Sequence, residues 1–302
     1  MRIAIIGAGG VGAYFGGVLA RAGHEVVMLA RGEHLEALRA RGIEVRNPEG
    51  SFVAPVAVTD NPDEIGRVDW AIVAVKSYSL AEVAATTRSL AESGALILPL
   101  LNGVEVVKRL TELGVPAGQI LAGMTQISAV RVEPGVVERK SDLARITFGE
   151  VEGGISERAT RFAETCQQAG IDVRVSEEIR VDLWRKFAFI ASAAAACGLA
   201  RISLGEINKT TLGHLLIERL IGEVIAVGRA LGVALPPGEE EAQIKFIDGL
   251  AISLKPSLLV DLEAGRPTEI NDLSGAVARL GRVVGIETPT HDTAAAALGV
   301  EH

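Results

Sequence analysis

The sequence predicts an α/β N-terminal domain with a doubly wound parallel sheet, followed by an all-helical C-terminal domain. Three observations predict this class. Short apolar runs alternate with helical patterns from residue 2 to residue 122, a glycine-rich turn follows the first run, and no convincing strand pattern appears beyond about residue 177. Strands separated by helices form βαβ units, whose parallel sheets are covered on both faces. We therefore predict two domains, residues 1–176 and 177–302.

In the first domain, strands are expected where short runs are continuously apolar, as a sheet buried on both faces requires. They cover residues 2–6, 25–30, 68–75, 95–99 and 119–122, with short β segments over 43–58. Helical patterns follow most of these strands, up to about Gly23 and at 33–41, 78–92 and 103–113. Residues 125–150 break the alternation, and Glu133-Pro134-Gly135 predicts a hairpin there. A helix at 156–169 and a strand at 171–175 close the domain.

In the second domain, helical patterns are separated by breakers such as Pro236-Pro237. They cover residues 178–199, 206–231, 239–252, 272–284 and 289–298.

Composition excludes several classes of partner. The net charge is -8 with scattered Lys and Arg, which argues against nucleic acid. The apolar stretch after Met1 is broken by glycines, and the Ala-rich segment 188–200 is too short to span a bilayer. Cys166 and Cys197 are the only cysteines and form no Cys-x-x-Cys pair, which fits a reducing compartment. We expect a cytoplasmic protein without a nucleic-acid or membrane partner.

A glycine-rich turn links the first strand to the first helix. Gly7-Ala8-Gly9-Gly10-Val11-Gly12 matches the pattern G-x-G-x-x-G in the context that gives the pattern its meaning. Gly7 permits the tight turn, Gly9 lets the backbone approach a pyrophosphate, and Gly12 lets helix and strand pack closely. The helix N-terminus supplies amide donors. The sequence therefore predicts a Rossmann-type dinucleotide site, the alternative being a glycine turn that binds nothing.

The residue that ends the second strand predicts which dinucleotide is bound. In NAD-binding domains an acidic side chain there holds the ribose 2′-hydroxyl. Arg31 occupies this place, and a guanidinium binds a 2′-phosphate by charge-assisted hydrogen bonds. We therefore expect NADPH rather than NADH, unless Arg31 is a solvated surface arginine.

Polar residues follow two further strands, at the sheet edge where open α/β folds bind ligands. Lys76 follows the run 68–75, and Asn102 follows the run 95–99 through two leucines. Both are expected to project toward the cofactor crevice. The alternatives are a solvated loop lysine and a turn or helix cap at Asn102-Gly103.

A carbonyl reduction needs a general acid, and Lys186 is the candidate. It lies in the first turns of a mostly apolar helix, where desolvation would lower its pKa toward neutrality, although an exposed lysine beside Arg185 fits the pattern equally. Glu269 and Ser257 are polar residues that helix capping would explain as well. No histidine has metal-ligand spacing, so no metal site is expected.

Taken together these residues resemble the ketopantoate reductase (2-dehydropantoate 2-reductase) family over essentially the whole chain. The resemblance rests on seven segments in order: GAGGVG at 7–12, Arg31, VKSYSL at 75–80, LNGVE at 101–105, LWRKF at 183–187, SLLVDLEAGRPTEIND at 257–272 and GIETPT at 285–290. It implies NADPH-dependent reduction of 2-dehydropantoate, a 2-oxo acid, to pantoate in pantothenate biosynthesis, by a Rossmann domain and a helical domain.

The resemblance also implies roles for single residues. Lys186 would protonate the substrate oxygen, and Glu269 would bind a substrate hydroxyl or orient Lys186. Asn102 would position nicotinamide and substrate, and Ser257 would touch the substrate carboxylate. The glycine loop and Arg31 would hold the cofactor, with Lys76 lining the same crevice.

One departure from the family bears on the substrate. Ketopantoate reductases resemble this helix but carry substrate-contacting asparagines four and eight residues after the catalytic lysine, where this chain has Ile190 and Ala194. Both positions share the helical face of Lys186. Two alternatives to a ketopantoate reductase therefore stand: a paralogue that reduces a more apolar 2-oxo acid or ketone, and an NADP-binding sensor without turnover. Retention of Lys186 with Asn102 and Glu269 favours an enzyme.

The second domain is rich in apolar helical surface, and Rossmann enzymes of this build are often dimers. We therefore predict a homodimer joined through residues beyond 177. Light scattering checks this expectation, and a monomer at micromolar concentration would contradict it.

Overall fold

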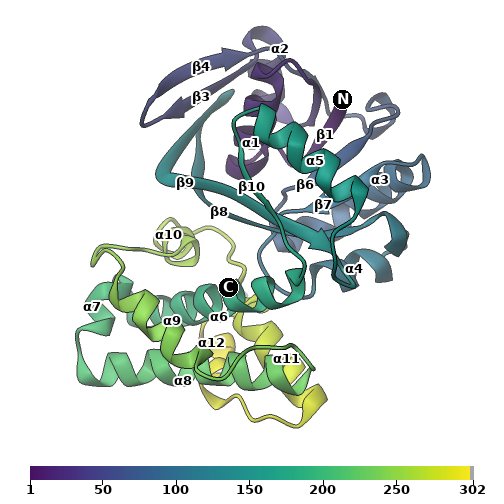
Figure 1. The fold of residues 1–302 in the computed structure, drawn as a ribbon. Coiled ribbons are helices and arrows are strands. Elements are labelled where there is room, and N and C mark those ends of the chain that lie inside the picture. The colour runs from purple at the N-terminus through teal and green to yellow at the C-terminus, as the bar shows by residue number, and fades with distance from the viewer. Residues whose placement is uncertain (300–302) are drawn as a thin grey trace. The chain divides into compact units, whose positions relative to one another are not determined.

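The computed structural model describes residues 1–299 and divides them into two compact units. The first unit contains residues 1–101 and 106–179, and the second contains 102–105 and 180 onward (Figure 1). The sequence predicted a single division after residue 176, and the structure divides the main chain three residues later. It also assigns the short segment 102–105 to the second unit, although its sequence neighbours on both sides belong to the first.

The first unit contains a five-stranded sheet whose described strand pairs are all parallel. Its order is β5 (Ala57–Thr59), β2 (Glu25–Leu29), β1 (Arg2–Ile6), β6 (Trp70–Val73) and β7 (Leu96–Pro99). The chain runs outward from β1 to β5 and then returns to the other side of β1, so the order reverses between β1 and β6. Ligands of open α/β sheets bind at the carboxyl ends of the strands beside such a reversal.

Alternation along β1 shows why its run is continuously apolar. Ile3 and Ile5 pack into the core on one face of the sheet, and Ala4 and Ile6 pack into the core on the other. All four are fully buried, as expected for successive side chains of a strand covered on both sides. The covering helices are α1 (Gly10–Arg21), α2 (Gly32–Arg41), α3 (Leu80–Glu92) and α4 (Val106–Glu112).

A second five-stranded sheet completes the unit. Its path is β10 (Asp172–Val175), β9 (Val136–Glu150), β3 (Ile43–Asn47) and β4 (Gly50–Ala54), with β8 (Leu121–Glu133) antiparallel to β9. The hairpin predicted at Glu133-Pro134-Gly135 joins β8 to β9. Helix α5 (Glu157–Gln168) packs beside it, and its Phe162 stacks on Trp70 of β6 with ring centroids 3.9 Å apart. This contact links the cores of the two sheets.

The second sheet corrects one prediction. Residues 119–122 were expected to continue the parallel alternation, but β8 begins at Leu121 and pairs antiparallel with β9. A single parallel bridge between Ile97 and Ile120 is what remains of the expected pairing. The reason is the length of the hairpin, whose thirteen and fifteen residues pair with each other in preference to β7.

The regular elements described from residue 180 to residue 299 are all helices. They are α6 (Ile179–Ala200), α7 (Leu204–Asn208), α8 (Thr211–Ala230), α9 (Glu239–Asp248), α10 (Ser257–Glu263), α11 (Ser274–Val284) and α12 (Pro289–Leu298), with a 3-10 turn at Ile270–Asp272. The fold class is therefore confirmed. Helix α10 was not predicted, because its seven residues are too few to show a helical period.

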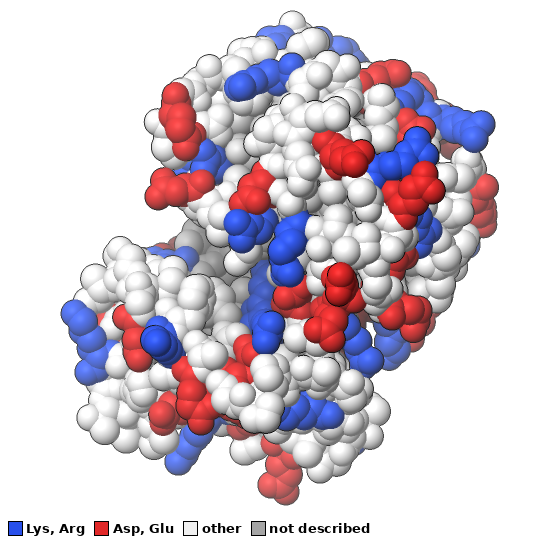
Figure 2. All heavy atoms as spheres, viewed as in Figure 1, with Lys and Arg blue, Asp and Glu red and all other residues white. Residues whose placement is uncertain are grey.

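Helix α6 is long and apolar enough by length and composition to cross a membrane. In the structure 61% of its most apolar 18-residue window is buried, as in the core helix of a soluble protein. On the visible face in Figure 2, acidic and basic side chains are interspersed over both units, as the scattered charge of the sequence indicates.

Candidate functional site

The glycine loop has the geometry that a dinucleotide requires. Gly7 has a φ of +102°, and a Cβ there would lie 2.9 Å from the backbone of Ala74. A Cβ at Gly12 would lie 2.1 Å from the carbonyl oxygen of Gly7, so the turn and the helix pack too closely for any side chain. Beside Gly9, in contrast, no heavy atom of the described residues, its own chain neighbours aside, lies within 4 Å of the Cβ position. This space is where a phosphate would approach the backbone.

The start of α1 offers donors to that space. Gly9 is its N-cap and supplies no side-chain hydrogen bond, so no N-cap side chain satisfies the first amides of the helix. Such amides, together with the helix dipole, bind anions. Gly10 leaves no room for a side chain either, because its Cβ position lies 2.1 Å from the carbonyl oxygen of Ala129 in β8. Ala8 is buried and Val11 is half-buried, so we expect any contact they make to a cofactor to come from the backbone.

Arg31 lies where the sequence predicted, just beyond β2 and at the N-cap of α2. Its side chain is 75% exposed, and its guanidinium lies 3.9 Å from the carboxylate of Glu82 in α3. Exposed ion pairs of this kind contribute about 0–1 kcal/mol. Arg31 therefore keeps its freedom to exchange this partner for a phosphate. Lys76 follows β6 at the start of the 3-10 turn Ser77–Ser79 and is half-buried.

Three predicted site residues meet in the second unit. Lys186, two turns into α6, donates a hydrogen bond from Nζ to Oδ1 of Asn102 over 3.0 Å. Burial lowers the pKa of Lys186 to about 8, and the nearby carboxylate of Glu269 opposes this by raising it. An ammonium group with this pKa is protonated at neutrality and gives up its proton readily. Because Lys186 is half-buried and hydrogen-bonded, it is not the exposed, solvated lysine that the sequence pattern also allowed.

Glu269 is buried, with 7% of its surface exposed. It stands at the N-cap of the 3-10 turn Ile270–Asp272, yet its side chain makes no capping hydrogen bond. The capping role that the sequence left open is therefore not the one its carboxylate performs. Its proximity to Lys186 gives it an electrostatic one, because a carboxylate stabilises the charged ammonium.

The remaining predicted residues lie on α6 and α10. Ile190 is half-buried and follows Lys186 by one turn on the same face of α6. Ala194 lies one turn further in the apolar core of the helical unit and is 1% exposed, so its methyl group does not reach an open surface. The expectation that it lines the substrate site stays a prediction, to be weighed against this burial in the helical core. Ser257 is exposed and is the first residue of α10, where Pro256 rather than Ser257 holds the cap position.

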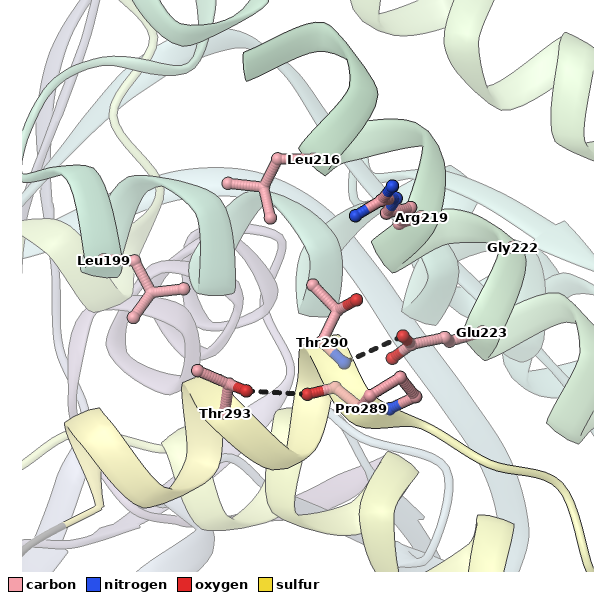
Figure 3. A pocket seen from close by; sticks show the side chains of 8 residues that line it. All are labelled: Leu199, Leu216, Arg219, Gly222, Glu223, Pro289, Thr290 and Thr293. Atoms are coloured by element: carbon pink, nitrogen blue, oxygen red, sulfur yellow. Dashed lines mark hydrogen bonds between the residues drawn. The ribbon is translucent and has the colours of Figure 1, made fainter. Parts of the chain in front are cut away.

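The helical unit also contains a pocket of about 530 Å³, which is lined by other residues than these. It is bounded by Leu199, Leu216, Arg219, Gly222, Glu223, Pro289, Thr290 and Thr293 (Figure 3). The Glu223 carboxylate accepts hydrogen bonds from the backbone N–H groups of Thr290 and His291, at 2.8 and 2.9 Å. The Glu223 carboxylate thus caps the N-terminus of α12. None of the eight lining residues is a predicted site residue.

Two further residues of the second unit, which were not predicted as site residues, pair beside the segment that carries Asn102. Glu105 and Arg279 form an ion pair of 2.7 Å within the second unit, between the segment 102–105 and α11. They are 174 positions apart, and neither stands in a local motif that predicts the partner.

Comparison with known proteins extends over both units. A family model described as ketopantoate reductase PanE/ApbA matches residues 3–153, and the model of its C-terminal region matches residues 178–301. A 2-dehydropantoate 2-reductase from Mesorhizobium japonicum is 32% identical over 313 residues, covering 97% of this chain and 95% of that protein. The resemblance found in the sequence is confirmed.

Solved structures agree with the fold. The crystal structure of 2-dehydropantoate 2-reductase from Geobacter metallireducens has a TM-score of 0.91 at 30% identity, covering 99% of each chain. The ternary structure of D-mandelate dehydrogenase with NADH and anilino(oxo)acetate has a TM-score of 0.88 at 25% identity, covering 99% of this chain and 97% of that one. Proteins with this architecture are thus named for reactions of more than one 2-hydroxy acid.

Proposed function

Because the chain belongs to the ketopantoate reductase family, we propose that it reduces a 2-oxo acid to a 2-hydroxy acid with NADPH. Oxidoreductase activity and a nicotinamide cofactor follow from the family and its structural neighbours. The observation that carries the proposal is the hydrogen bond between Lys186 and Asn102, together with the pKa of about 8 at Lys186.

The residues of this chain have distinct tasks in the proposed reaction. The nicotinamide supplies a hydride when bound. Lys186 holds a proton at Nζ for the substrate oxygen, which becomes an alcohol, and Asn102 orients that ammonium through its side-chain oxygen. Glu269 keeps Lys186 charged, because its carboxylate raises a pKa that burial lowers. The glycine loop would hold the pyrophosphate at the start of α1.

Arg31 is proposed to select NADPH over NADH by binding the 2′-phosphate. A hydrogen bond to a charged group contributes about 1.5–3 kcal/mol, which corresponds to roughly tenfold to a hundredfold in affinity. Titration of both cofactors should show this preference in the wild type and its loss in Arg31→Ala. Arg39→Ala is the matched control, because Arg39 is an exposed, ion-paired arginine of the same helix. If Arg31→Ala keeps the wild-type preference, Arg31 is a bystander.

A second candidate concerns the substrate. The half-buried Ile190 stands one turn from Lys186, where ketopantoate reductases resemble this helix but carry an asparagine. D-mandelate dehydrogenase, whose structure is similar to this one, was solved with a 2-oxo acid analogue that carries an aromatic group. We propose that this chain prefers a 2-oxo acid with a more apolar side chain than ketopantoate. NADPH oxidation across a panel of 2-oxo acids tests both candidates, and no turnover with any of them would favour a sensor.

A further inference from the structure

One arginine side chain joins the two loop segments that carry Asn102 and Glu269. Arg279 of α11 donates from Nη2 to Oε2 of Glu105 over 2.7 Å, and from Nη1 to the carbonyl oxygen of Asn271 over 2.9 Å. Glu105 lies three residues after Asn102, and Asn271 lies two residues after Glu269. A single guanidinium thus bridges both segments within the second unit.

The two segments also meet directly. Gly103 has a φ of +105°, and a Cβ there would lie 3.3 Å from the carbonyl oxygen of Asp272. A side chain at this position would be strained by the positive φ, and its Cβ would need the Asp272 carbonyl to give way by a few tenths of an ångström. The close approach therefore depends on a glycine, and the bridge through Arg279 holds it closed.

The chemistry of the bridge suits a fixed position. A guanidinium is planar and presents its donors in a rigid fork, so two hydrogen bonds to different segments define their separation and angle. The Glu105 side chain is only 16% exposed. A charge-assisted hydrogen bond with one partner this sheltered is stronger than a solvated surface pair.

We propose that Arg279 is a positioning residue that holds Asn102 and Glu269 against Lys186 for proton transfer. This inference rests on the proposed function of Lys186 as the acid. Arg279 itself need touch neither substrate nor cofactor. Loss of the bridge would let both segments shift, and small misplacements of reacting groups cost up to about a hundredfold in rate.

Steady-state kinetics of Arg279→Met tests the proposal. We expect kcat to fall about tenfold to a hundredfold while the Kd of NADPH stays within about twofold. The basic limb of the pH–kcat profile should also move to lower pH, because a displaced Glu269 no longer raises the pKa of Lys186. Arg279→Lys keeps the charge and should restore part of both effects.

The matched control is Arg282→Met. Arg282 lies on the same helix and forms a 2.6 Å ion pair with Asp292, but it contacts neither loop segment through that pair. It should keep wild-type kcat and the wild-type pH profile. If Arg279→Met fails to fold, Glu105→Gln tests the same bridge, since it removes only the charge of the acceptor, and we expect a smaller fall in kcat with the same direction of pH shift.

The outcomes separate this inference from the proposed function. If Lys186→Ala abolishes turnover but Arg279→Met and Glu105→Gln behave like Arg282→Met, the positioning role is wrong and the acid stands. If Lys186→Ala retains full activity, the proposed function of Lys186 is wrong, and the bridge loses the role proposed for it.

Discussion

Lys186→Ala is expected to lower kcat by about a hundredfold or more, the usual scale of general acid–base assistance. The variant removes a proton donor that is hydrogen-bonded to Asn102 and feels the charge of Glu269. NADPH binding should change by less than about twofold, because the phosphate contacts proposed for the glycine loop and Arg31 do not involve Lys186. Stopped-flow or steady-state measurement of NADPH oxidation with the best 2-oxo acid of the panel gives kcat, and fluorescence titration gives Kd.

The pH dependence follows from the same side chain. The proposed reaction needs Lys186 protonated, and burial lowers its pKa to about 8. The wild-type kcat should therefore be level below that pH and fall as pH rises through it, by about tenfold per unit if proton transfer limits the rate. Lys186→Ala should lose this basic limb together with most of its rate. A limb that persists unchanged in the variant would assign it to another group.

The Tm of a variant distinguishes loss of the catalytic group from loss of the fold. Because folding lowers the pKa of Lys186, the unfolded chain binds more protons between the lowered and the usual value, so this lysine opposes folding at neutral pH. That penalty is complete below about pH 8 and fades as pH rises toward the usual pKa of a lysine. Lys186→Met, which fills the same space, should therefore be inactive with an undiminished Tm. Lys245→Ala, at an exposed lysine of α9, should keep full activity. If Lys186→Ala remains active, Lys76 is the next candidate acid.

The parts of the fold that local pattern determines were predictable. The strand β1, the glycine loop and α1 follow one another in a single short stretch, so the order of strand, turn and helix can be read from local pattern. The second sheet was harder, because β9 pairs with β3 and β10, which are far apart in the chain. Apolar runs show that a strand exists but not which strand it pairs with.

The candidate site shows the same limit. Lys186 and Asn102 were predicted from their places in a helix and after a strand, whereas a role for Glu269 came only from the family resemblance. The structure brings the three residues together. Arg279 was missed, since a charged residue on an exposed helix face is typical of any soluble protein. Glu105 was missed because nothing local to it indicates a partner 174 positions away. The burial of Ala194 was missed as well, because a shared helical face with Lys186 does not say where the core closes over that face.

Wild-type enzyme is expected to reduce ketopantoate poorly and a more apolar 2-oxo acid faster. At position 190 a sec-butyl group replaces the amide that ketopantoate reductases carry there. A polar substrate group brought to it would be desolvated without a partner, at a cost of about 1–3 kcal/mol. One such group corresponds to roughly one to two powers of ten in kcat/KM, and a second at position 194 would extend this to roughly two to four if the two costs added.

The burial of Ala194 decides how the test is built. An asparagine there enters an apolar core and must find a partner, so Ile190→Asn alone is the first variant. In Ile190→Asn/Ala194→Asn the two amides lie one helical turn apart, where they can hydrogen-bond to each other. Ile244→Asn on α9 is the matched control, because it places the same amide at another half-buried isoleucine of the helical core.

Measurement of kcat/KM for ketopantoate and for a phenyl-bearing 2-oxo acid then separates specificity from general damage. Ile190→Asn should raise kcat/KM for ketopantoate and lower it for the apolar acid, and the double variant should extend both changes if it stays folded. Ile244→Asn should move the two values in the same direction or not at all. The prediction is wrong if the wild type already reduces ketopantoate with a kcat/KM on the order of 10⁴ M⁻¹s⁻¹ or above, the range of a dedicated enzyme. In that case Ile190 faces a part of the substrate that needs no hydrogen bond, and the amide of the relatives is dispensable.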